Sequence, residues 1–248
     1  MAGHSKWANI KHRKAAVDAK RGKMFTKLIR ELTVAAKEGG PEADSNPRLR
    51  AAINTAKGQN MPNDTIDRAI KRGSGDMDGV VYQEVFYEGY GPGGSAVYVQ
   101  ALTDNKNRTV AAVRSLFNKN GGNLGETGCV AWIFEMKGRM TFNSETVTED
   151  QLFEIAIDAG AEDVVTEDDD LVVITNTDDF ENVKTVIKDS GLDYTEAEVT
   201  MVPQSNVKID GKEAERMIRL MEALEDSDDV QNVYANFDIS EELLEALG

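Results

Sequence analysis

The distribution of charge along the chain is the feature that most restricts what it can fold into. Residues 1–73 carry 16 Lys and Arg against 7 Asp and Glu, whereas residues 74–248 carry 12 against 37. The first segment is therefore +9 and the second −25, within a formal net charge of −16. Exposed charges more than about 8 Å apart are largely screened at physiological salt. We therefore expect a basic module joined to an acidic body that can face a different partner.

The basic segment has helical periodicity after an arm at residues 1–13. Apolar residues recur at steps of three and four up to about Lys37, and a Gly-Gly-Pro sequence at 39–41 ends this helix. A second helix is predicted to begin with Asn46 as its cap, and a third follows residues 61–64. Three short amphipathic helices predict a small bundle. The glycine-rich stretch 73–79 that follows predicts a flexible linker.

The acidic remainder alternates between strand and helix patterns. The order β-α-β-β-α-β is complete within residues 139–202, which is typical of the split βαβ, or ferredoxin-like, arrangement. Residues 81–137 read as strand, strand, helix and strand, with 129–137 as the last strand, and lack a further helix and strand to complete a similar layer. The C-terminal stretch 207–240 offers both.

These patterns predict an α+β protein of several domains. It comprises a three-helix basic domain followed by two ferredoxin-like α/β domains, one inserted in the other. The expected divisions are 1–78 for the basic domain, 79–138 and 205–248 for the two parts of one α/β domain, and 139–204 for the inserted one. The alternative is three domains in simple sequence order. The insertion requires that the strand at 230–238 pairs with a strand from 81–137.

The sequence offers little for catalysis. It has no phosphate loop of the GxxxxGK[ST] type, no nucleophile elbow and no Cys/His metal spacing. Both histidines, His4 and His12, lie among cations, and the single cysteine, Cys129, lies in an apolar run. The acidic run 167–171 could hold Mg²⁺ weakly, although a solvated hairpin turn is the simpler interpretation. We expect no enzymatic activity, no cofactor and no metal.

The basic segment points instead to nucleic acid. Lys and Arg side chains neutralise phosphates, and an aromatic ring such as that of Trp7 or His12 can stack on a base. A run of charge is more often a solvated surface. The aromatic residue within the run, the opposite charge of the remainder and the further basic helix faces favour binding. The candidate contact residues are Lys6, Trp7, Lys11, His12, Arg13, Lys14, Lys20, Arg21, Lys23, Lys27, Arg30, Arg48, Arg50 and Lys57.

Long motifs then connect the chain to a known family. The opening MAGHSKWANIKHRK, the stretch NPRLRAAINTAKGQNMPNDTIDRAIKRG, the turn YEGYGPGG and the run TDNKNRTVAAVRSLFNKNGGNLGETGCVAWIF closely resemble the YebC/PmpR family, which includes the mitochondrial translational activator of cytochrome oxidase. The resemblance covers essentially the whole chain. It begins at the first residues, so we expect a bacterial cytosolic member without a presequence.

The resemblance implies a helical N-terminal domain plus two α/β domains, and a probable transcriptional regulator that binds DNA without catalysis. It also implies an alternative, a translation factor that binds ribosomal RNA and aids the synthesis of difficult nascent sequences such as proline runs. In that case the acidic domains could face ribosomal proteins. No apolar run is long enough to span a bilayer, so we expect no membrane partner, a cytoplasmic location and a monomer.

Overall fold

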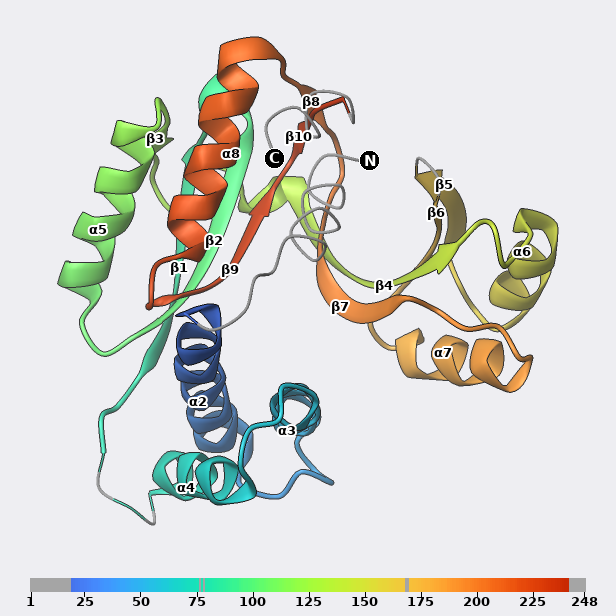
Figure 1. Ribbon diagram of the computed structural model, residues 1–248, viewed down its shortest axis with the longest axis horizontal. Helices are drawn as coiled ribbons and strands as arrows, with labels where there is room; N and C mark the ends of the chain where they lie inside the picture. Colours follow the sequence, from blue (N-terminus) through green and yellow to red (C-terminus); the bar gives the residue numbers. More distant parts are fainter. Residues whose placement is uncertain (1–18, 76, 78, 168–169, 241–248) are drawn as a thin grey trace.

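The computed structural model describes residues 19–75, 77, 79–167 and 170–240, the first three of these by their backbone alone. The described chain is an α+β protein in three parts, as predicted (Figure 1). A helical part lies against one end of a central sheet. A second sheet extends from the central one through the long strands β4 (Phe134–Asn143) and β7 (Glu196–Pro203).

The helical part contains α2 (Ala19–Gly39), α3 (Pro47–Gly58) and α4 (Asn63–Ser74). Asn46 caps α3 as predicted, because its side-chain oxygen accepts a hydrogen bond from the Leu49 N–H at 3.0 Å. Its amide group also donates to the carbonyls of Ala35 and Gly40, both at 2.8 Å. One buried side chain therefore joins the end of α2 to the start of α3.

The helices pack closely through small residues. Gly73 of α4 lies so near α2 that a Cβ atom there would be 2.2 Å from the carbonyl oxygen of Thr33. This approach lets α4 lie along α2 over the apolar core. That core consists of Leu28, Leu32, Ala35, Ala36, Leu49, Ala52, Ala56, Met61, Ile66 and Ala69.

The central sheet has the strand order β3-β1-β2-β9, with antiparallel neighbours throughout. Its strands are β1 (Gln83–Tyr90), β2 (Ala96–Thr103), β3 (Asn123–Leu124) and β9 (Val230–Ala235). The helices α5 (Lys106–Lys119) and α8 (Gly211–Glu225) share one apolar core with the same face of the sheet. The elements follow the chain order ββαβαβ rather than the split βαβ order.

The pairing that the insertion requires is present. β9 pairs antiparallel with β2, with Val97 opposite Ala235 and Tyr98 opposite Tyr234. The central sheet is thus built from two stretches of chain, and the second sheet lies between them in sequence. The domain boundaries after residues 78, 138 and 204 stay a prediction.

The strand expected at 129–137 is confirmed only from Phe134 onward and is wrong for residues 129–133. Residues Ala131–Ile133 form a 3-10 turn, and β4 (Phe134–Asn143) is one continuous strand of the second sheet. The physical reason is Glu88, whose buried carboxylate accepts the N–H groups of Gly128, Val130 and Ala131 at 2.7–2.8 Å. Those N–H groups are therefore not available to a strand ladder.

The second sheet has the order β5-β6-β4-β7, again with antiparallel neighbours, which is the predicted split βαβ arrangement. It consists of β4, α6 (Glu149–Asp158), β5 (Asp163–Glu167), β6 (Asp170–Thr175), α7 (Phe180–Asp189) and β7 (Glu196–Pro203). Two further short strands pair in parallel with each other. They are β8 (Val207–Lys208), which follows β7 in the chain, and β10 (Phe237–Asp238), which follows β9.

Candidate nucleic-acid interface

Three predicted contact residues on α2 face the acidic body. Lys23, Lys27 and Arg30 follow one another on successive turns of the helix. The Lys23 ammonium lies 3.4 Å from Oδ1 of Asp226, and the Lys27 ammonium donates to the carbonyl oxygen of Glu225 at 2.7 Å. These two acceptors lie at the C-terminal end of α8, where the helix dipole adds to the attraction for a cation. The basic helix is thus held against the body by its own charges.

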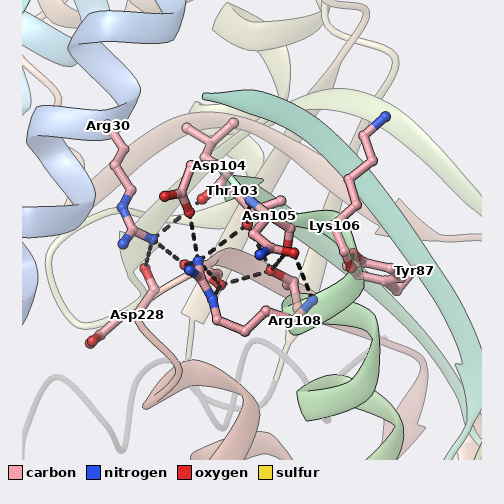
Figure 2. A network of polar contacts seen from close by, with 11 residues as sticks. Arg30, Tyr87, Thr103, Asp104, Asn105, Lys106, Arg108 and Asp228 are labelled. Carbon is pink, nitrogen blue, oxygen red and sulfur yellow. Dashed lines mark hydrogen bonds and ion pairs between the residues drawn. The ribbon is translucent and has the colours of Figure 1, made fainter. Parts of the chain in front are cut away.

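The centre of this contact is a buried carboxylate, that of Asp229. Asp229 is 8% exposed and accepts hydrogen bonds from Arg30 Nη1 at 2.8 Å, Arg108 Nη2 at 2.9 Å and the Thr109 hydroxyl at 2.7 Å. Burial opposes its ionisation, but the hydrogen bonds from Thr109 and Arg108 and the charge of Arg30 outweigh burial and lower the pKa of Asp229. Figure 2 shows Arg30 and Arg108 pointing toward one another from different helices.

Arg30 has further partners in the body. Its guanidinium also donates to the carbonyl oxygens of Asp228 and Leu102, and it lies 5.3 Å from the centre of the Tyr82 ring. The Arg30 side chain is only 12% exposed. In this arrangement Arg30 links the helical part to the central sheet, and its contact with nucleic acid stays a prediction.

Arg48 on α3 is held in the same way. Its guanidinium pairs with Glu31, Glu38 and Glu84, each at 2.7 Å. Burial works against the charged form, but the hydrogen bonds and charges of Glu31 and Glu84 outweigh it and raise the pKa of Arg48. Because Glu84 belongs to β1, Arg48 is a second link between the helical part and the central sheet.

Other cations of the helical part face solvent. Arg50 and Lys57 are exposed and lie on one face of α3, with Asn54 between them. On α4, Arg68 and Lys71 are exposed and Arg72 is half-buried, and Lys71 and Arg72 lie three and four residues after Arg68. We refer to these two sets as the α3 stripe and the α4 stripe. Within the described part of the chain, no member of either stripe forms an ion pair.

The remaining predicted contact residues cannot be placed in the same detail. The backbone of α2 includes Lys20 and Arg21. Outside the described residues lie Lys6, Trp7, Lys11, His12, Arg13 and Lys14.

The described residues contain no group of three or more His, Cys, Asp or Glu side chains placed to hold a metal ion. Asp168 and Asp169 of the acidic turn, and both histidines, lie outside the described residues. Cys129 is half-buried, and burial together with the charge of Glu88 raises the pKa of its thiol, which leaves it a weak nucleophile. Among the described helices, none is long and apolar enough to cross a bilayer.

The fold is that of a multi-domain protein with a basic helical part docked on the central one of two α/β layers. Comparison with known proteins identifies the family. Residues 5–76 match the family described as "TACO1/YebC protein N-terminal domain", and residues 82–237 match "TACO1/YebC second and third domain". The chain belongs to the TACO1/YebC family.

Its relatives are similar over their whole length. A "Probable transcriptional regulatory protein" from Geotalea uraniireducens is 59% identical over 247 residues, and one from Dictyoglomus turgidum is 57% identical over 248, with each chain fully covered. The crystal structure of "a Conserved Hypothetical Protein Aq1575 from Aquifex Aeolicus" matches with a TM-score of 0.83 at 50% identity, covering 96% of this chain and 98% of that one. The family is one of probable transcriptional regulators and not of enzymes.

Sequence reasoning missed the docking role of the α2 cations. Their partners, at residues 225–229, lie about 200 positions away, and no local pattern connects them. The available signal was the acidic run after the helix expected within the C-terminal stretch 207–240, which could have been matched to a basic helix face by charge alone.

Proposed function

We propose that this protein is a non-enzymatic regulator of gene expression that binds DNA through its basic N-terminal domain. The observation that carries the proposal is that the cations of the described helices fall into two groups, one bound to the body and one without ion pairs among the described residues. Lys23, Lys27, Arg30 and Arg48 are bound to the body. The α3 and α4 stripes form no ion pair among the described residues, and all of their members except the half-buried Arg72 are exposed. Free cations on adjacent helices are what a phosphate backbone requires.

The acidic body supports an oriented approach. Residues 74–248 carry a charge of −25, which repels phosphate, while the docked α2 neutralises part of the body at residues 225–229. A nucleic acid would therefore meet the helical part from the side that carries the α3 and α4 stripes. Screening beyond about 8 Å keeps the remaining acids from cancelling this attraction.

The α3 helix is the element best suited to reading bases. It has 12 residues, a length of about 18 Å, and presents Arg50, Asn54 and Lys57 along one exposed face. Arg and Asn side chains form the bidentate contacts that distinguish guanine and adenine in a major groove about 12 Å wide. The α4 stripe would then contact the phosphate backbone, since its cations are Arg and Lys spaced along one face.

A pair of charge-matched variants tests the surface. Lys57→Glu with Lys71→Glu reverses one cation on each stripe, and Lys188→Glu with Lys208→Glu makes the same change on exposed cations of the second and central α/β layers. We expect the first double variant to lose at least tenfold in affinity for duplex DNA and to flatten the slope of log K against log salt by about 2, since two phosphate contacts are removed. Equal losses for both variants would show that only net charge matters and would reject the surface.

The alternative target is structured RNA of the ribosome, since phosphate contacts by Lys and Arg do not by themselves select DNA. Footprints on promoter DNA that persist at raised salt would support the DNA proposal. Co-sedimentation with ribosomes, lost in the Lys57→Glu, Lys71→Glu variant, would replace it with the translational role. Replacement of Lys11, Arg13 and Lys14 by Glu tests the arm in both assays, and we expect binding to be lost.

A further inference from the structure

The outer edge of the central sheet is open along most of β1. The neighbouring strand β3 is two residues long and pairs only with Gly89 and Tyr90, and one further bond runs from the Gly125 N–H to the Glu88 carbonyl at 2.8 Å. Between Gln83 and Tyr87, no described strand lies on that side of β1. About five residues, some 17 Å of strand, are left as an edge.

The register shows which backbone groups point outward from this edge. The Leu102 N–H donates to Asp229, so the polar backbone groups of Leu102 face away from β1. Glu84 lies opposite Leu102 in the β1–β2 ladder, so these two residues form a pair that is not hydrogen-bonded. The N–H and C=O groups of Glu84 therefore face the open side of β1. Because this direction alternates along a strand, Phe86 also faces outward, in agreement with the outward carbonyl of Glu88.

A groove runs along this edge, between β1 and α5. Its lining includes Val85 and Tyr87 from β1, Val110 and Arg114 from α5, and Leu124 with Glu126 beyond β3, and it encloses about 430 Å³. Val85, Val110 and Leu124 are partly buried against the core of the central layer, so the floor is apolar and fixed. A strand added to β1 would direct every second side chain onto this floor.

The charges around the groove favour an acidic occupant. The described helix α5 has four cations and no acid, and one of these cations, Arg108, forms ion pairs with Asp104 and Asp229. Lys106 and Arg114 are exposed and form no ion pair with any described residue. Arg114 lies on the groove itself. The acids that line the groove among the described residues are Glu126 and Glu88, and the Glu88 carboxylate already accepts three backbone N–H groups.

The edge also lacks the features that usually protect an open strand. The sequence QEVFYEGY of β1 contains no Lys and no Pro, and its register with β2 is unbroken. Proteins commonly block such edges with lysine, proline, a bulge or a covering element, because unpaired N–H and C=O groups recruit another strand. We propose that the β1 edge and α5 form a receptor groove in which an extended, acidic and apolar segment of a partner protein adds as a further strand of the central sheet.

Two substitutions at one position separate backbone pairing from side-chain contact. Phe86→Pro removes the outward N–H but no bond of the β1–β2 ladder, since Phe86 and Gln100 are not a hydrogen-bonded pair. Phe86→Ala removes the same ring, which stacks on Tyr98 at 5.2 Å, and keeps the N–H. The two variants therefore differ mainly in the donor that the proposal requires.

The test is selection of a phage-displayed library of random nonapeptides on the full-length protein, followed by fluorescence anisotropy of the enriched peptides. We expect sequences with alternating apolar residues and at least one acid, bound by wild type and Phe86→Ala and weakened at least tenfold by Phe86→Pro. In wild type, the amide hydrogens of Glu84 and Phe86 should become protected from exchange when peptide binds, which tests the site even if Phe86→Pro does not fold.

Four results would overturn the proposal. One is that no peptide is enriched, and a second is that the enriched peptides bind both Phe86 variants equally. A third is a dimer in sedimentation velocity that Phe86→Pro dissolves, because the edge would then serve a second copy of the chain. The fourth is protection of the same amides by an RNA or DNA oligonucleotide instead of a peptide.

Discussion

Replacement of Asp229 by Asn should loosen the helical part from the body. The substitution keeps the size of the side chain and removes the charge that Arg30 and Arg108 share. Arg30 would keep its bonds to the carbonyls of Leu102 and Asp228, but as a cation that is 12% exposed it would have lost its counter-ion. The predicted cost follows from this unpaired charge.

The magnitude is about 3 kcal/mol. Removing one partner of a buried ion pair costs roughly 3–5 kcal/mol, because the other charge is left buried and unpaired. The lower end applies here, since Arg30 retains two carbonyl acceptors and the Arg108 side chain, 50% exposed, can reach water. The destabilisation should appear as a lower free energy of local opening for α2 and for the β2–β9 pair, because the hydrogen-bond network around Asp229 joins these elements.

Native-state hydrogen exchange measured by mass spectrometry suits this chain, because a multi-domain protein need not unfold in one step. A double-mutant cycle with Arg30→Met should give a coupling energy of about 2 kcal/mol between Arg30 and Asp229. The control is Arg219→Met, whose pair with Glu215 is exposed at 64% and 40% and should contribute less than about 1 kcal/mol.

The pH dependence provides a second check. Because the pKa of Asp229 is lowered in the folded protein, its contribution is fully present above the ordinary value of 3.8 and is lost as the pH falls through the folded value. The difference in opening free energy between wild type and Asp229→Asn should therefore be constant near neutral pH and should shrink toward zero in acid. A coupling below about 0.5 kcal/mol, or a difference that does not depend on pH in acid, would refute the reasoning.

Three further predictions concern single positions. Glu88→Gln should cost about 2–4 kcal/mol and speed amide exchange at Gly128, Val130 and Ala131, since one amide oxygen cannot replace a carboxylate that accepts three N–H groups. Burial opposes the ionisation of Glu88, but those hydrogen bonds outweigh burial and lower its pKa. The difference in stability between wild type and Glu88→Gln should therefore shrink as the pH falls below the ordinary value of 4.5. Unchanged amide exchange in the variant would contradict this prediction. Gly73→Ala should lower the free energy of unfolding by about 1–3 kcal/mol, and with it the thermal midpoint, because the added methyl meets the Thr33 carbonyl. Gly58→Ala, where the added methyl meets open space, should not lower the thermal midpoint. Cys129 should react with a disulfide reagent at pH 8 more slowly than a free thiol and at the free rate after urea unfolding, and equal rates in both states would argue against its raised pKa.

Local signals in the sequence were read correctly where they act over a few residues. The Asn46 cap, the helices after it and the split βαβ order of the second sheet all follow from periodicity and capping. The exception was the strand expected at 129–137, which has an apolar β-like sequence. Residues 129–133 do not form a strand because the Glu88 carboxylate binds backbone N–H groups that a strand would need, and the strand begins only at Phe134.

The sequence by itself determined the helical start, the α/β remainder and the separation of charge between them, because each is a property of neighbouring residues. Only the tertiary structure decided which cations are paired. It places Arg30 on Asp229, 199 positions away, and leaves the α3 and α4 stripes open. The physical reason is that a charge takes its partner from whatever the packed backbone brings within hydrogen-bonding distance, and residue spacing along the chain carries no record of that contact.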